Sequence, residues 1–307
     1  MLLGVLAVIL MGASWIVTGI VMGKVPKLGI SADVFLFVGS TFITLAGVIV
    51  GCVHGFPPGM PLGKVALVLG ILFVGGIINN RQLAFMSRAM QHGPNGIIWS
   101  FIQCGFIVPF ILLNIVFPDK NEVSVCRVLA CLALIAAMII MGVTGQKNKE
   151  STGPWLMLTC LAFLATGISQ TMNNMPSFLK GADEINSAWK TAACECGIGM
   201  GSFLFSLFGR KQSSFMPKVR KAMKKPVFWG FIAFNSITAF LGGFFLLYFG
   251  MDRLAKHNAG AIAYPLMTGS CILAFDLYSL LVLHEHRTCL QLFALLLCLL
   301  GIVGFCF

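Results

Sequence analysis

The chain has 307 residues, of which 58% are hydrophobic and 10% charged, and its mean hydropathy is +0.93. Soluble proteins carry roughly 25% charged residues, so this composition excludes a soluble domain, a coiled coil and a disordered chain. The net charge of +11 does not indicate a nucleic-acid partner, because seven of the 21 basic residues fall in one loop, as is common beside membrane spans.

Ten apolar segments follow one another along the chain, each close to the roughly 20 residues that a membrane-spanning helix needs. The first is followed by Lys24 and Lys27 and lacks a cleavage site, so we expect a retained helix rather than a signal peptide. The sequence therefore predicts an all-α integral membrane protein with ten transmembrane helices, at about 2–21, 33–53, 64–90, 94–117, 123–145, 154–178, 185–208, 226–250, 258–283 and 288–307.

A polar run from Gln146 to Pro154 divides the chain nearly in half. A shift of 165 residues aligns the Arg-x3-His pair at the end of the third segment with that at the end of the eighth, and apolar residues match beside it: Arg88, His92, Ile97, Ile107 and Phe110 fall on Arg253, His257, Ile262, Ile272 and Phe275. Five helices per half is an odd number, so the second half would enter the membrane upside down, as in many secondary transporters. We expect two inverted five-helix repeats, 1–147 and 148–307; chance matching of common apolar residues is the alternative.

The distribution of Lys and Arg favours one orientation in the cell membrane. Loops after odd-numbered segments hold 13 of these residues and loops after even-numbered segments hold seven, including Lys190. The positive-inside rule then puts the odd loops in the cytoplasm and both termini outside. The preference depends on one loop, which contains Arg210, Lys211, Lys218, Arg220, Lys221, Lys224 and Lys225.

Two carboxylates lie deep inside predicted segments, whereas the other eight lie at or near segment boundaries. They are Glu195 in the seventh segment and Asp276 in the ninth. Ionisable groups inside a membrane are costly and commonly functional. We therefore expect proton coupling at Glu195 or Asp276; the alternative is a carboxyl group that only bonds a neighbouring helix.

Arg81 is the one arginine deep in a predicted segment, directly after Asn79 and Asn80. These polar groups cannot all face lipid, so we expect them to line a hydrated cavity. Arg81 would pair with Glu195, with Asp276 or with an anionic solute. The alternative places Arg81 closer to the interface, with its side chain extended to water.

Amides and aromatic side chains recur in the middle of other predicted segments. Such groups suit a polyhydroxy or heterocyclic small molecule, although interhelical hydrogen bonds are an alternative role for them. The expected solute-binding residues are Asn79, Asn80, Arg81, Trp99, Gln103, Gln170, Asn173, Asn174 and Tyr264.

No motif in the sequence favours an enzyme, a metal or a cofactor. GxSxG, HExxH and P-loop patterns are missing. His284-Glu285-His286 falls in a tight loop, and the Cys194-x-Cys196 pair has no histidine cluster nearby, so neither is expected to bind a metal. The eleven cysteines lie almost all in apolar runs and are expected to pack as small apolar residues.

The ten-segment layout resembles the drug/metabolite transporter superfamily over the whole chain. The stretch Leu283–Arg287 followed by Leu300-Gly301-Ile302-Val303-Gly304 is similar to that family's acidic residue before a glycine-containing last helix. The N-terminal stretch from Gly12 to Lys27 is similar to the rhamnose–proton symporter branch. The resemblance implies secondary transport of sugars, nucleotide sugars, amino acids or amphipathic compounds, and it assigns no sugar-binding residue.

The sequence therefore predicts a proton-coupled secondary transporter that moves a small polar metabolite (sugar-like, amino-acid-like or nucleobase-like) by alternating access through a central cavity. A passive facilitator or channel, an exporter of amphipathic compounds and a membrane-embedded lipid-modifying enzyme are the alternatives. The expected partners are the solute, the lipid bilayer and protons, with no nucleic acid and no cofactor, and the chain would act as a monomer or a homodimer.

Overall fold

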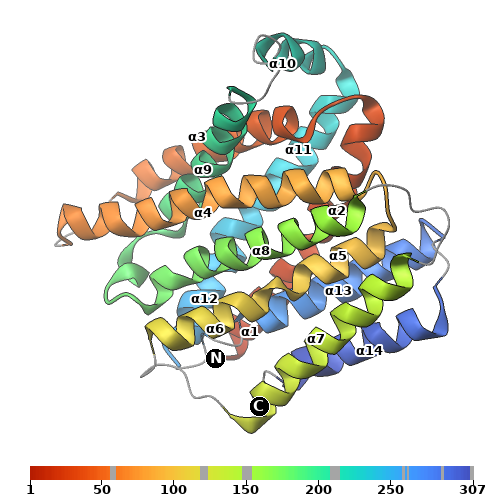
Figure 1. Cartoon of the computed structure of the whole chain (residues 1–307). Coiled ribbons are helices and arrows are strands. Elements are labelled where there is room, and N and C mark those ends of the chain that lie inside the picture. The colour runs from red at the N-terminus through yellow and green to blue at the C-terminus, as the bar shows by residue number, and fades with distance from the viewer. Residues whose placement is uncertain are drawn as a thin grey trace.

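The computed structural model describes residues 1–55, 60–117, 124–146, 154–207, 215–257, 260, 263–284 and 287–304, without the side chains at 138, 141–143, 145 and 146. These residues form helices joined by short connections, and no strand occurs among them (Figure 1). The prediction of an all-α protein is confirmed for the described part of the chain.

Each of the ten predicted segments coincides with one helix or with a run of consecutive helices. The first five are α1 (Leu2–Ser14) with α2 (Ile16–Lys24) and η1 (Val25–Leu28), α3 (Ala32–His54), α4 (Leu62–Ala89), α5 (Asn95–Gln103) with η2 (Cys104–Phe106) and α6 (Ile107–Val116), and α7 (Val125–Gln146). The last five are α8 (Trp155–Asn174) with η4 (Met175–Phe178), α9 (Ser187–Leu207), α11 (Pro226–Leu241) with η7 (Gly242–Leu247) and α12 (Tyr248–Ala255), α13 (Ala263–Leu281), and α14 (Cys289–Gly304). A short helix, η5 (Ala182–Glu184), precedes α9.

Seven described helical runs are long and apolar enough to cross a membrane, as a multi-pass membrane protein requires. Two shorter apolar helices, Val125–Ala137 and Cys289–Gly304, accompany them, and α9 is long enough but carries Lys190 and Glu195. Crossing by all ten segments stays a prediction. The seven runs are Leu2–Leu28, Ala32–His54, Leu62–Ala89, Asn95–Val116, Trp155–Phe178, Pro226–Ala255 and Ala263–Leu281.

The centre of the molecule is built on α9, which packs against both α3 and α4. The backbones of α4 and α9 touch, because glycines face each other across the contact. A Cβ atom on Gly76 would overlap the carbonyl of Cys194, and one on Gly197 would overlap the carbonyl of Phe73. Small residues at such positions are the usual means of close helix packing in lipid.

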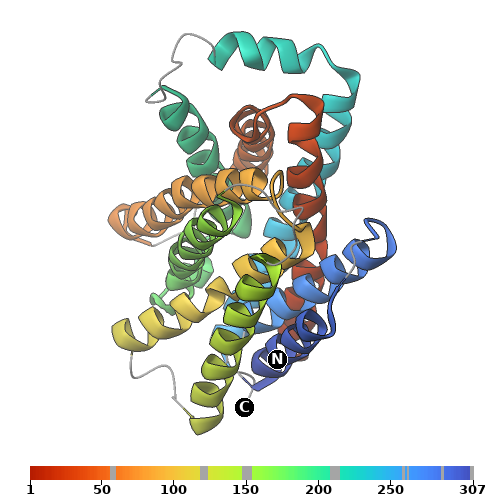
Figure 2. The same ribbon diagram turned by 45° about the vertical axis from the view of Figure 1, so that its right-hand side comes forward.

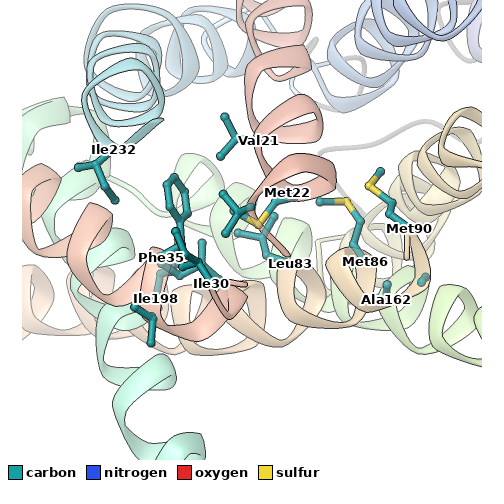
Figure 3. Packing of buried hydrophobic residues seen from close by; sticks show 14 of the residues in the cluster. Val21, Met22, Ile30, Phe35, Leu83, Met86, Met90, Ala162, Ile198 and Ile232 are labelled. Carbon is teal, nitrogen blue, oxygen red and sulfur yellow. The ribbon is translucent and has the colours of Figure 1, made fainter. Parts of the chain in front are cut away.

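A buried apolar cluster joins helices from both halves of the chain (Figure 3). Phe35 of α3 lies among side chains of α2, α4, α9 and α11, including Met22, Leu83, Ile198 and Ile232. This packing holds the two halves together beside the centre of the molecule.

Further helix pairs link the halves in a regular way. The run α1–α2 packs against α12 and α13, while α8 packs against α4, α5 and α6. The helices α7 and α14 pack against each other at one side of the molecule (Figures 1 and 2). Gly301 and Gly304 of α14 sit on Ala130 of α7, which allows this close approach.

One helix was not expected from the sequence. Residues 210–226 were predicted as a loop, but α10 (Phe215–Met223) forms within it. Phe215, Val219 and Ala222 recur at helical spacing and are buried against the rest of the molecule, which explains the helix. Other predicted features lie outside the described residues: Arg210 and Lys211, most of the 146–154 run, Ile262, Glu285 and His286.

Candidate solute-binding cavity

A cavity of about 150 Å³ lies between helices of both halves. Its walls come from α1 to α5 on one side and from α8, α9 and α11 to α13 on the other. A cavity of this size accommodates a molecule about as large as benzene. The structure brings seven of the predicted site residues into its lining: Asn79, Trp99, Gln103, Gln170, Asn173, Glu195 and Tyr264.

Four buried oxygen atoms in this lining lack a hydrogen-bond partner among the described residues. They are Gln103 Oε1, Gln170 Oε1, Asn173 Oδ1 and Thr191 Oγ1, and these residues are 3%, 6%, 8% and 2% exposed. An unsatisfied buried polar group costs about 1–3 kcal/mol, so such atoms commonly bind water or a ligand. The cavity is therefore equipped to receive hydrogen-bonding groups.

Glu195 lies halfway along α9 and faces the cavity. Ser40 of α3 donates a hydrogen bond of 2.8 Å to its Oε2 atom. Four aspartates in the described part of the chain form ion pairs with Lys or Arg. In contrast, no described basic residue lies within ion-pair distance of Glu195. The carboxyl group of Glu195 is thus available to a proton or to a solute.

Aromatic rings form much of the remaining wall. Trp99 is stacked on Phe275 with 4.9 Å between ring centroids, which fixes the orientation of its ring. Trp15, Phe35, Tyr248 and Tyr264 also line the cavity. Such rings provide flat apolar surfaces against which a cyclic solute can stack.

The helix breaks lie beside the cavity. Ser14 and Trp15 line it where α1 ends and α2 begins. The π-helix η7 contributes Gly243, where an added Cβ would lie 2.9 Å from Thr191 Oγ1. Such π-helical turns are frequent at functional sites because they re-aim side chains and free backbone groups.

Asp276 lies outside the lining and is already paired. Arg287 donates a hydrogen bond of 2.7 Å to its Oδ1 atom, and Ser100 lies 3.4 Å from the same atom. Arg287 was counted as a loop residue, but its side chain is only 3% exposed because it extends back to α13. The structure thus gives Asp276 a different environment from that of Glu195.

The expected pairing of Arg81 with Glu195 or Asp276 is wrong, and Arg81 is absent from the cavity lining. Arg81 instead pairs with Asp33, contacts Asn80, and lies 4.0 Å above the ring of Phe205. The physical reason is its position: Arg81 is eight residues from the end of α4, level with the first turn of α3, which begins at Ala32.

Two other predicted site residues are also absent from the lining. Asn80 donates a hydrogen bond of 2.6 Å to Ser202 and joins α4 to α9. Asn174 lines a separate small pocket beside Phe178 and Pro265.

The ion pair between Lys190 and Asp252 lies near the C-terminal end of α3, whereas the pair Arg81–Asp33 lies at its N-terminal end. Lys190 was counted among the loop residues, but it lies in α9, is 1% exposed, and donates a hydrogen bond of 2.7 Å to Asp252. The adjacent Thr191 lines the central cavity, while Asp252 lines an outer vestibule of about 470 Å³. The pair Lys190–Asp252 therefore lies between the vestibule and the cavity.

The vestibule carries charges at its rim. Lys256 lies 2.8 Å from Asp183, and this hydrogen bond lowers the pKa of Asp183 and raises the pKa of Lys256. Both groups thus stay charged near neutral pH. Other polar residues in the wall are His54, Glu184, Asn186, Ser187 and Arg253.

The sequence did not single out several lining residues, namely Trp15, Thr18, Ser40, Thr191 and Tyr248. Each is a single polar or aromatic residue in an apolar helix, without a local pattern. Their place in the lining becomes visible only when helices from both halves are arranged around the cavity.

No protein-family model matches the sequence, and a search of curated proteins gives no match. Eighteen chains of solved structures match the fold. One of them, described only as "Crystal structure of protein", is similar with a TM-score of 0.59 and 13% sequence identity. The match covers 99% of this chain and 94% of that chain, so the whole chain shares its fold with a known structure.

Proposed function

We propose that this protein is a secondary transporter of a small polar organic solute, coupled to protons through Glu195. The observation that carries this proposal is the central cavity, which is lined by a carboxyl group without a basic partner and by four unsatisfied oxygen atoms. Transporters commonly bind their solute and coupling ion near the middle of the membrane, between two structural halves.

The lining also restricts the charge of the solute. No Lys, Arg or His lines the cavity among the described residues, and Glu195 supplies a carboxyl group. An anion bound there would have no partner for its charge and would lie beside another acidic group. The solute is therefore uncharged or cationic, and a sugar-like or nucleobase-like molecule fits better than a carboxylate.

We also propose that the ten segments span the membrane as two inverted five-helix repeats, as in the drug/metabolite transporter superfamily, and the pattern of helix contacts fits such a repeat. The ten segments can be numbered in chain order, so that segment n of one half corresponds to segment n + 5 of the other. Under this exchange of halves, the contact between segments 1 and 9 corresponds to that between 6 and 4. The contacts 1–8 and 2–8 correspond in the same way to 6–3 and 7–3, and all six pairs are in contact. The pairs two with seven and five with ten map onto themselves. This is the pattern that a twofold relation between the two halves would produce.

Two rivals in transport make different predictions. A passive facilitator would use the same cavity without needing a carboxyl group in it. An exporter of amphipathic compounds would favour a larger and more apolar cavity than one of about 150 Å³. A lipid-modifying enzyme, the remaining alternative, would need reactive groups near one interface; we propose transport without enzymatic activity.

Solute binding is tested by thermal unfolding of the purified protein with a panel of sugars, nucleobases, amines and organic acids. A ligand that binds the folded state raises the unfolding temperature by mass action. We expect the stabilising compounds to be uncharged or cationic, and we expect Gln170→Ala to reduce their effect. Stabilisation mainly by organic acids would contradict the proposal.

The matched control is Gln291→Ala, because Gln291 is a buried glutamine in α14, outside the cavity. This variant is expected to keep the ligand-induced shift of the unfolding temperature even if its own stability falls. An equal loss of the shift in both variants would contradict the assignment of the cavity.

A further inference from the structure

The helix α10 differs from the other helices in composition and position. It runs across one end of the molecule, where it contacts α3 and α11 (Figure 2). Phe215 packs edge-on against Phe37 at 5.5 Å, and Lys225 donates a hydrogen bond of 2.6 Å to the carbonyl of Leu28. These contacts fix α10 to the ends of the apolar helices.

Three stripes run along α10. One stripe, Phe215, Val219 and Ala222, is buried against the protein. At 3.6 residues per turn, Met216 and Met223 share one flank, where they are 49% and 41% exposed. Lys218, Lys221 and Lys224 lie on the rest of the solvent-facing surface, and Arg220 lies between them and the methionine flank; all four are exposed.

Trp229 places this helix at the level of a membrane surface. Its Nε1 atom donates a hydrogen bond of 2.8 Å to the carbonyl of Met223, at the end of α10. Its ring packs against Phe42, which lies on the exposed face of the apolar helix α3. Tryptophan is enriched at the boundary between hydrocarbon and headgroups, where one side of the ring is apolar and its N–H is polar.

The charge around α10 is of one sign. No acidic residue occurs between 215 and 229, and Lys24, Lys27 and Arg88 are exposed at the same end of the molecule. Asp33, which also lies at this end, is paired with Arg81. The cations of α10 therefore have no carboxylate partners among the described residues nearby.

We infer that α10 is a binding surface for the headgroups of anionic phospholipids in the leaflet that it faces. The Met216–Met223 flank would enter the boundary of the acyl chains, and the basic side would bind phosphate groups. Helices that combine an apolar flank with a Lys- and Arg-rich face lie in the membrane interface in this way. This surface is separate from the central cavity and does not depend on the proposed transport.

The test uses the whole protein in phosphatidylcholine vesicles that contain phosphatidylglycerol with brominated acyl chains. Bromine quenches tryptophan fluorescence on contact. In a background with Trp15→Phe and Trp189→Phe, Trp229 is the one partly exposed tryptophan, because Trp99 and Trp155 are buried. Quenching by brominated phosphatidylglycerol, relative to brominated phosphatidylcholine at the same mole fraction, gives a relative association constant. We expect this relative association constant to be at least about five. That value corresponds to the attraction of one basic residue to an anionic membrane surface.

Substitution of Lys218, Lys221 and Lys224 by Gln should bring the constant close to one. The matched control is Lys64→Gln with Lys180→Gln, which removes exposed lysines from the opposite end of the molecule and should leave the constant unchanged. High salt should lower the preference of the unsubstituted protein by screening, which tests the idea without any substitution on α10.

Several results would overturn the inference. They are equal quenching by the two lipids in the unsubstituted protein, an unchanged constant in the triple variant, and an equal loss in the control. Millimolar inorganic phosphate that abolishes the preference, when chloride of equal ionic strength does not, would assign the surface to free phosphate and contradict a lipid surface.

Discussion

At the scale of single residues, the decisive distinction is between paired and unpaired charges. Glu195 and Asp276 look equivalent in the sequence, since both are carboxylates inside apolar segments. The structure separates them, because Arg287 reaches Asp276 whereas Glu195 has a hydroxyl partner, Ser40. A partner that arrives from a distant loop cannot be read from the residues around a carboxylate.

Arg81 provides a prediction at this scale. Because Arg81 binds Asp33 and lies outside the cavity, Arg81→Lys should leave solute affinity unchanged. Lysine lacks the planar fork of donors, so the unfolding free energy should fall by on the order of 1 kcal/mol. Thermal unfolding with and without solute measures both quantities. If Arg81→Lys bound the solute more weakly while its stability stayed normal, Arg81 would have to be part of the binding site.

At the scale of helices, the sequence located the apolar segments well because hydrophobic length is a local property. The observed boundaries at α3, Ala32–His54, lie close to the predicted 33–53. The interruptions within the helical runs could not be predicted in this way, because they depend on contacts between helices. An example is η7, a π-helical turn whose glycines lie against Thr191 and Met11 of other helices. The helix α10 was missed because its apolar stripe is short and interrupted by basic residues.

The contact between α4 and α9 predicts a clear contrast between two glycines of one helix. Gly76→Val should lower the unfolding free energy by at least about 1–3 kcal/mol, because its side chain would meet the backbone of Cys194. Gly70→Val is the matched control, since an added Cβ there has no neighbour within 4 Å. Similar thermal stability of the two variants would contradict the close packing of these helices.

The ion pair between α9 and α12 gives a second prediction for helix packing. Lys190→Met should lower the unfolding free energy by about 3–5 kcal/mol, because it strands the charge of Asp252. Adding Asp252→Asn should recover much of this loss. Lys256→Met, which breaks the exposed pair with Asp183, should have a much smaller effect. No recovery in the double variant would show that the two charges do not interact.

At the scale of the whole molecule, the sequence predicted which residues are polar and deep but not how they meet. Asn79, Gln103, Gln170 and Glu195 come from four helices and reach one cavity. Asn80 and Asn174 directly follow the cavity residues Asn79 and Asn173 in the chain, but their side chains point elsewhere. In an α-helix the direction of the side chain changes by about 100° from one residue to the next. Polar residues that are adjacent in the sequence therefore point to different places in the structure.

The two ends of the molecule should face opposite sides of the membrane. The α10 end carries the basic cluster, so we expect it in the cytoplasm and the vestibule outside. In a background without reactive native cysteines, Glu184→Cys should react with an impermeant thiol reagent in intact cells. Lys221→Cys should react only after the cells are opened. The reverse pattern would invert the orientation.

The central claim is that Glu195 couples solute movement to protons, and proton flux in proteoliposomes tests it most directly. The protein is reconstituted with a pH-sensitive dye inside, and compounds that raise its unfolding temperature are added outside. We expect at least one compound to be taken up together with protons, so that the lumen acidifies. In Glu195→Gln the proton movement should disappear, whereas in Asp276→Asn it should persist if the variant folds. Solute uptake without proton movement in the unsubstituted protein, or unchanged acidification in Glu195→Gln, would contradict the claim.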